Sequence, residues 1–114
     1  MACNQFNFET IKGDTWDGAM FQIIVNSGSL DLSYCNIKAD FKVNRSDTAA
    51  YTMSTENNRI EITEPLEGKF RMIPQIINLK PATYIYDMQF TFTDTLIVKT
   101  YFSGHLTVSQ DITT

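Results

Sequence analysis

The sequence predicts an all-β protein folded as a β-sandwich, and three observations support this prediction. From Tyr84 to Phe92 every second residue is Tyr, Met or Phe, which is the period of a half-buried strand. Strand-like segments recur at roughly ten-residue spacing, separated by turn signals, with almost no helical periodicity. A strand with large apolar side chains on one face needs a second apolar layer, and another sheet supplies that layer.

The composition indicates one folded domain with protein partners. The 114 residues, of which 43% are hydrophobic and 19% charged, suffice for one core, so we expect a single domain over 1–114. The net charge of −4 leaves no excess of Lys and Arg for phosphates, which argues against nucleic acid and anionic membranes as partners. The first residues lack the pattern of a secretory signal, so we expect synthesis in a cytoplasm. Cys3 and Cys35 are then expected to be reduced thiols, with a bridge between them as the alternative.

The first half of the chain contains the first predicted strands. Residues 5–11 alternate and predict a first strand, whereas 16–25 have apolar side chains on both faces and predict a strand in the centre of a sheet. Residues 30–33 predict a connection at which the chain changes sheets. Residues 36–44 alternate and predict a strand with one wet face, and 51–53 predict a short pairing segment.

The second half predicts a hairpin, a crossing loop and the last two strands. Residues 59–63 and 69–73 alternate and predict the hairpin. Residues 74–81 lack alternation and end in Pro81, so we expect a loop that crosses between the sheets. The aromatic strand then turns and returns along 96–102, and Gly104 predicts a bend or bulge. Seven or eight such strands predict an immunoglobulin-like (Ig-like) antiparallel β-sandwich.

The order of short motifs along the chain resembles a known viral family. The motifs are Gly-Asp-Thr-Trp at 13–16, Leu-Asp-Leu-Ser at 30–33, Ile-Glu-Ile at 60–62, Glu-Gly-Lys-Phe at 67–70, Pro-Ala-Thr-Tyr-Ile-Tyr-Asp at 81–87, and Gly104 ahead of Leu-Thr-Val at 106–108. In this order they resemble the small Ig-like domain of tailed-phage structural proteins, such as the N-terminal domain of the baseplate upper protein and related tail and head fibre domains. The resemblance covers most of the chain from Gly13 to Thr113.

The resemblance implies a bacteriophage virion structural protein. It implies an assembly or attachment domain of the baseplate, tail, neck or head fibre, made in the host cytoplasm and located in the virion, with its position and symmetry left open. It also implies other virion proteins as partners, a homo-oligomer, no enzymatic activity and no cofactor. In this family the domain usually precedes a longer fibre or binding region, whereas this sequence stops after it, which favours a connector, ring or decoration role. The open edges of a sheet can pair with other chains, and one modest interface repeated many times in a particle gives strong binding in total. Both properties favour a domain that assembles into a larger particle.

The titratable residues predict no catalytic or metal site. His105 is the only histidine, so neither a histidine pair for a metal nor a conventional catalytic triad is available. Four acids could in principle surround calcium, but they lack the spacing of an EF-hand loop and are better explained as turn caps: Asp14, Asp17, Asp31 and Asp40.

Most aromatic residues alternate in phase and are predicted to lie in the core, whereas four could form an interaction surface: Trp16, Tyr34, Tyr51 and Tyr101. These residues suggest an alternative function, a free-standing module that binds a carbohydrate or a cell-surface partner through Trp16 and the loop at 45–50.

Two further side chains predict local contacts of the aromatic strand. Tyr84 resembles the tyrosine at the start of such strands whose hydroxyl bonds to upstream backbone. Asp87 lies on the polar face, where it could pair across strands with Lys99.

Overall fold

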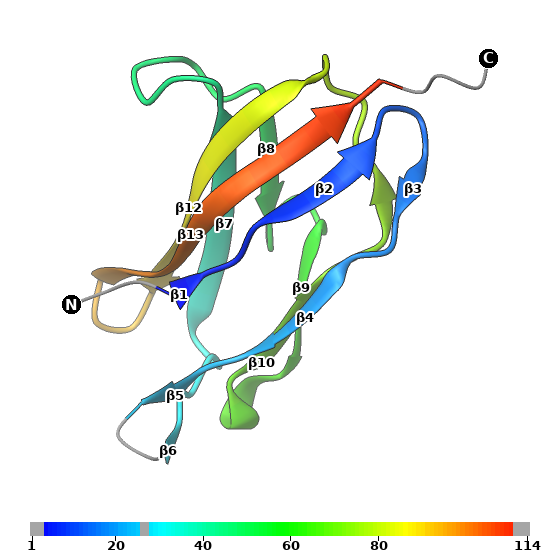
Figure 1. Cartoon of the computed structure of the whole chain (residues 1–114). Coiled ribbons are helices and arrows are strands. Elements are labelled where there is room, and N and C mark those ends of the chain that lie inside the picture. The colour runs from blue at the N-terminus through cyan, green and yellow to red at the C-terminus, as the bar shows by residue number, and fades with distance from the viewer. Residues whose placement is uncertain (1–3, 26–27, 111–114) are drawn as a thin grey trace.

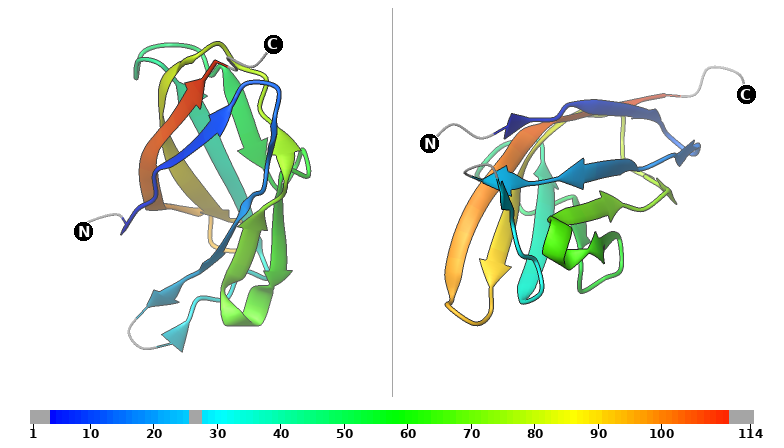
Figure 2. Two further views of the ribbon diagram at one scale, coloured as in Figure 1. Left: turned by 45° about the vertical axis from the view of Figure 1, so that its right-hand side comes forward. Right: turned by 90° about the horizontal axis from the view of Figure 1, so that it is seen from below.

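The chain folds into two β-sheets that pack against each other (Figures 1 and 2). The computed structural model describes residues 4–25 and 28–110. The larger sheet contains, in spatial order, β1 (Asn4–Gln5) and β2 (Phe8–Ile11), which both pair with β13 (Ile97–Ser109), and then β12 (Ala82–Phe92), β7 (Cys35–Lys42) and β8 (Tyr51–Ser54).

The smaller sheet and two short ribbons complete the structure. The smaller sheet has the order β4 (Ala19–Gln22), β10 (Lys69–Met72) and β9 (Ile60–Glu64). The ribbons pair β3 (Thr15–Trp16) with β11 (Gln75–Ile76) and β5 (Ile24–Val25) with β6 (Gly28–Ser29), and a 3₁₀ helix, η1 (Pro65–Glu67), joins β9 to β10. The predicted all-β sandwich is confirmed. The described residues form thirteen strands instead of seven or eight, because several predicted strands are split into shorter pieces.

The aromatic strand lies in the centre of the larger sheet, as predicted. β12 pairs with β13 on one side and β7 on the other. Its inward side chains are buried, and so are those of β7: Tyr84, Tyr86, Met88 and Phe90, then Ile37, Ala39 and Phe41. Across the core, the ring of Phe70 on β10 meets that of Phe90 edge to face, with centroids 5.4 Å apart. The hydrophobic core therefore fills the space between the two sheets.

The N-terminal strands depart from the predicted antiparallel arrangement. β1 and β2 both run parallel to β13 and lie along its outer edge (Figure 1). The chain between them passes over Gly104, where a Cβ atom would overlap the carbonyl oxygen of Phe6. β13 continues through Gly104, so this glycine permits a close crossing of two chain segments. The hydroxyl of Tyr86 donates a 2.5 Å hydrogen bond to the Phe6 carbonyl, which fixes the crossing to the central strand.

The prediction of one central strand over 16–25 is wrong. The segment is divided into the end of β3, β4 and β5, with Gly18 at a φ of +85° between the first two. A Cβ atom at Gly18 would overlap the carbonyl oxygen of Met72, so the break is also a close backbone approach. Among the described residues β4 pairs only with β10, and Met20 is 80% exposed. The apolar residues on both faces therefore do not indicate burial on both sides.

The two predicted sheet changes and the predicted hairpin are confirmed. The segment 30–33 leads from the smaller sheet toward β7, and it buries Leu32, whose N–H donates to the carbonyl of Pro65 at 2.8 Å. The segment 74–81 returns from β10 to β12 and buries Ile77, but it is not a loop throughout, because Gln75 and Ile76 form β11 and pair with β3. β9 and β10 pair antiparallel, and Gly68 ends η1 at a φ of +68°.

Of the two local predictions for the aromatic strand, one is confirmed and one is wrong. The hydroxyl of Tyr84 donates to the carbonyl oxygen of Lys80 at 2.7 Å, as expected for a tyrosine that closes a corner. Asp87, however, lies opposite Ser103 on β13, while Lys99 lies opposite Phe90. A bulge after Met88 shifts the register between the strands, and no ion pair joins Asp87 to Lys99.

Candidate functional site

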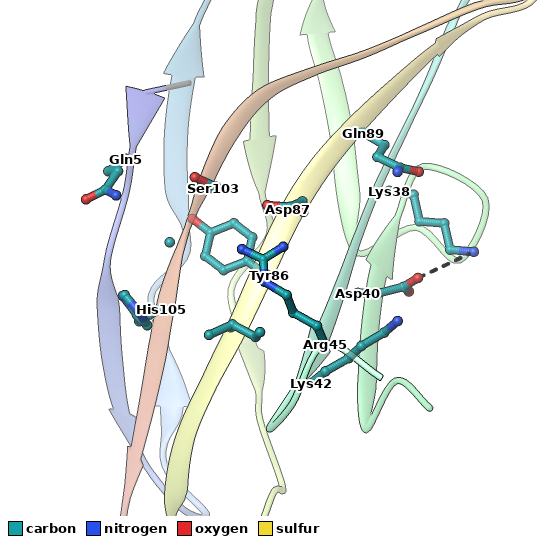
Figure 3. A pocket seen from close by; sticks show the side chains of 12 residues that line it. Gln5, Lys38, Asp40, Lys42, Arg45, Tyr86, Asp87, Gln89, Ser103 and His105 are labelled. Atoms are coloured by element: carbon teal, nitrogen blue, oxygen red, sulfur yellow. Dashed lines mark ion pairs between the residues drawn. The ribbon is translucent and has the colours of Figure 1, made fainter. Parts of the chain in front are cut away.

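A polar hollow lies on the outer face of the larger sheet, the face turned away from the core. It has a volume of about 290 Å³ and crosses β7, β12, β13 and β1 (Figure 3). Its polar lining consists of Gln5, Lys38, Asp40, Lys42, Arg45, Asp87, Gln89, Ser103 and His105. These side chains share one face because outward positions on neighbouring strands lie side by side at every second residue. We call this group the polar hollow.

Two carboxylates face each other in the polar hollow. Asp40 on β7 and Asp87 on β12 are direct cross-strand partners, an arrangement in which like charges repel. Asp40 is stabilised locally, because the Thr52 hydroxyl donates to it at 2.7 Å and the Lys38 ammonium lies 3.7 Å away. Within the described ranges Asp87 is exposed and has neither a hydrogen bond nor an ion pair through its side chain. Asp87 is therefore a carboxylate with free acceptor capacity.

Two cations of the polar hollow are also without charged partners. Lys42 extends from the end of β7, and Arg45 reaches from the loop that follows toward β12 (Figure 3). In residues 4–25 and 28–110 neither side chain makes an ion pair. Together with Lys38 they place three of the protein's nine Lys and Arg residues around two of its thirteen acids. The polar hollow is therefore locally positive on a protein of net charge −4.

A second feature is an apolar end of the sandwich. Seven of the eleven exposed large hydrophobic side chains of the described residues lie on β5, on the segment before β7, on η1, and on the β12–β13 turn with the start of β13: Ile24, Val25, Tyr34, Leu66, Leu96, Ile97 and Val98. Figure 1 shows the β12–β13 hairpin at the lower left and the β5–β6 ribbon at the bottom. We call this group the apolar end.

Backbone hydrogen bonds hold the connections of the apolar end together. The N–H of Leu32 donates to the Pro65 carbonyl at 2.8 Å, which joins the segment before β7 to η1. The N–H of Thr93 donates to the Tyr34 carbonyl at 2.8 Å, which joins the same segment to the β12–β13 hairpin. These hydrogen bonds fix the connections to one another, so the backbone that carries the exposed apolar side chains is held in place.

The four predicted surface aromatics do not lie together. The ring of Trp16 stacks on Phe8 with centroids 4.4 Å apart, and Trp16 pairs with Gln75, whose side chain contacts the Tyr51 hydroxyl. Tyr34 is exposed at the apolar end, and Tyr101 packs edge to face on Phe90 at 5.2 Å. Trp16 and Tyr51 therefore share Gln75 as a neighbour, and within the described residues no ring contact joins either of them to Tyr34 or Tyr101. Trp16 packs on the inner side of the sheet and Arg45 lines its outer side, so the predicted sugar platform of Trp16 with the 45–50 loop is not assembled.

Tyr51 belongs to a polar network between the two sheets. Its hydroxyl accepts a 2.6 Å hydrogen bond from Arg59 and contacts Gln75, and the Arg59 guanidinium lies 5.0 Å from the centre of the Tyr51 ring. Partial burial raises the pKa of Tyr51, while the positive charge of Arg59 acts in the opposite direction. The half-buried phenol is thus a structural group that stays neutral at physiological pH.

The remaining candidates have structural roles. Asp31 accepts hydrogen bonds from the N–H and hydroxyl of Ser33, which lower its pKa and confirm it as a turn cap. The backbone N–H of His105 donates to the Asn7 side chain at 2.9 Å. Across the described part of the chain, no three His, Cys, Asp or Glu side chains gather as metal ligands. Cys35 is a buried thiol, and its possible pairing with Cys3 concerns a residue outside the described ranges.

Burial of Cys35 predicts a pH-dependent loss of stability. Desolvation raises the pKa of the Cys35 thiol from 9.0 to about 11 in the folded protein. The unfolded chain releases this proton at a lower pH, so the free energy of unfolding should fall between pH 9 and about 11. Urea denaturation of the reduced protein at several pH values measures this fall. The Cys35→Ala variant should lose that part of the decline, and identical pH profiles for the two proteins would contradict the prediction.

No protein-family model matches the chain, and no curated protein matches its sequence. Within the described residues, no helix is both long and apolar enough to cross a membrane. The fold and the surface therefore define the class of this protein. It is a small β-sandwich that has an apolar end and a polar hollow. The polar hollow was not predicted, although the alternation of 36–44 and of the aromatic strand placed Lys38, Asp40 and Asp87 on polar faces. The two polar faces form one surface because β7 and β12 are neighbours in the sheet, and the sequence does not specify this pairing.

Proposed function

We propose that the protein is a structural component of a tailed-phage virion, an Ig-like domain that assembles with copies of itself and with other virion proteins. The observation that favours this most is the apolar end, because exposed hydrophobic side chains on connections that are hydrogen-bonded to one another are typical of a protein interface. The interface needs no cofactor. In a closed ring, every pair of neighbouring copies would form this same interface.

The strand order supports the Ig-like part of the proposal. In the larger sheet β13, β12, β7 and β8 follow the order G-F-C-C′ of Ig-like sandwiches, and β4, β10 and β9 follow the order B-E-D. The Tyr84 corner is a further feature of such domains. The order of sequence motifs that resembles the phage domains adds the virion location, which detection of the chain in purified phage particles would test.

Self-association should depend on the apolar end. We expect light scattering to show a mass above that of the monomer within a range of about 1 μM to about 1 mM protein. Val98→Asp should weaken this association by about tenfold or more, because burial of an unpaired carboxylate is costly. The matched control is Val43→Asp, since Val43 is similarly exposed (49%, against 54% for Val98) but lies in the loop after β7 at the other end.

Two results would contradict this proposal. The first is a protein that stays monomeric over the whole concentration range, since no interface between copies would then exist. The second is equal weakening by Val98→Asp and Val43→Asp, since the interface would then lie away from the apolar end. Circular dichroism of both variants should show that the two substitutions leave the fold intact.

A further inference from the structure

We propose that the polar hollow binds a sugar that carries a carboxylate, such as a hexuronic acid or sialic acid residue of a glycan. In this arrangement Arg45 and Lys42 hold the sugar carboxylate and Asp87 accepts hydrogen bonds from its hydroxyl groups. The inference goes beyond the proposed assembly function and does not depend on it. It uses the outer face of the larger sheet, whereas assembly uses the apolar end.

Three charged side chains of the polar hollow have no charged partner among the described residues. Arg45 and Lys42 make no ion pair among the described residues, although both reach into the same hollow as an unpaired carboxylate, Asp87 (Figure 3). Asp87 also lies directly opposite Asp40, where like charges repel. A ligand with an anionic group and several hydroxyl donors provides partners for all three unpaired side chains at once.

The polar hollow suits a sugar acid better than a simple anion. A bare anion in the polar hollow would approach Asp87 and Asp40 as well as the cations, so attraction and repulsion would oppose each other. Hydroxyl groups turn this repulsion into hydrogen bonds, because an ionised carboxylate is an acceptor only. Gln5, Gln89 and Ser103 supply further neutral donors and acceptors in the lining. The lining is therefore suited to a polyhydroxylated acid.

The size of the polar hollow limits the ligand that it can hold. A volume of about 290 Å³ lies at the lower limit of small-molecule sites. The hollow lies on an open sheet face, so a terminal residue can enter while the rest of a glycan stays in solvent. Half-buried Ile85 adds an apolar contact on the floor between the polar positions. The site therefore fits one terminal acidic residue.

The test is nuclear magnetic resonance titration of ¹⁵N-labelled protein with free acidic monosaccharides. N-acetylneuraminic acid and glucuronic acid are the two acidic ligands, and they distinguish sialic acid from hexuronic acid as the source. Glucose and acetate are the controls for hydroxyl groups alone and for a carboxylate alone. We expect saturable shifts of residues around the polar hollow with an acidic sugar and little response to either control.

Variants test the assigned contacts. Arg45→Gln and Asp87→Asn should each weaken binding of the acidic sugar by about tenfold or more, since each replaces a charge-assisted hydrogen bond by a weaker neutral one. The control is Arg71→Gln, because Arg71 lies on the smaller sheet and pairs with Glu61 at 2.8 Å, away from the hollow. Arg45 and Asp87 are exposed, so unchanged amide spectra should show that both variants fold.

Each outcome of this test is decisive. Binding of either acidic sugar that depends on Arg45 and Asp87 but not on Arg71 would support the proposal. An equal response to acetate would overturn it, because the hydroxyl contacts would then contribute nothing. Absence of shifts at tens of millimolar sugar, or shifts remote from the hollow, would also overturn it. The light-scattering result for Val98→Asp is unaffected by any of these outcomes, so the two proposals fail separately.

Discussion

Gly104→Ala is expected to destabilise the protein by about 3 kcal/mol or more, a large fraction of the stability of a domain of this size. A Cβ atom at Gly104 would overlap the carbonyl oxygen of Phe6, which is backbone and cannot rotate away. The crossing is held from both sides, because the Phe6 N–H donates to the Ser103 carbonyl at 2.9 Å and the Phe6 carbonyl accepts from Tyr86. Relief of the clash therefore requires the N-terminal strands to leave β13.

Urea denaturation of wild type and variant measures the loss. The matched control is Gly28→Ala, because Gly28, like Gly104, has no positive φ, but a Cβ atom there meets only ordinary contacts, the nearest at 3.7 Å. We expect the control to change the free energy of unfolding by no more than about 0.5 kcal/mol. A small loss for Gly104→Ala would mean that the crossing of the N-terminal strands can move aside at little cost.

Phe90→Ala should cost about 3–5 kcal/mol, the range for removal of a fully buried phenylalanine. Phe90 is 0% exposed and lies where the two sheets meet, with its ring against Phe70 of the smaller sheet and Tyr101 of β13. Both neighbours are on strands that pair with others, so they cannot collapse freely into the space left behind. A cavity would therefore remain in the centre of the core.

Thermal and urea unfolding of Phe90→Ala test this expectation, with Met20→Ala as the control. Met20 is 80% exposed on β4, so its truncation should stay within about 0.5 kcal/mol of wild type. Similar effects of the two substitutions would show that the core between the sheets adds little to stability. That result would contradict the two-sheet packing on which both proposed surfaces depend.

The two proposed surfaces make different physical demands on the fold. The apolar end combines β5 and the start of β13 with the connections between strands, and these connections are joined by the hydrogen bonds of Leu32 to Pro65 and of Thr93 to Tyr34. The polar hollow lies mainly on paired strands, and its spacing follows the register of β7 with β12. A protein with both surfaces could hold neighbouring copies at one end while its sheet face stays open to a ligand.

Strand faces were predictable from the sequence wherever one side of a strand is wet. The alternation of the aromatic strand and of 36–44 correctly identified Tyr86, Phe90 and Phe41 as core residues. The same reasoning failed for 16–25, because apolar residues on both faces are equally compatible with a broken edge strand that exposes Met20. Local patterns report which residues prefer burial, but they do not report how many neighbours a strand has.

The sequence by itself determined the all-β class, the central aromatic strand, the two sheet changes and the Tyr84 corner, because each follows from period, turn chemistry or proline over a few residues. The tertiary structure alone decided the parallel N-terminal strands, the register that separates Asp87 from Lys99, and both surface sites. These features join residues far apart in the chain, such as Gln5 with Arg45 or Tyr34 with Thr93. Their proximity arises from strand pairing and sheet packing, which no short stretch of sequence specifies.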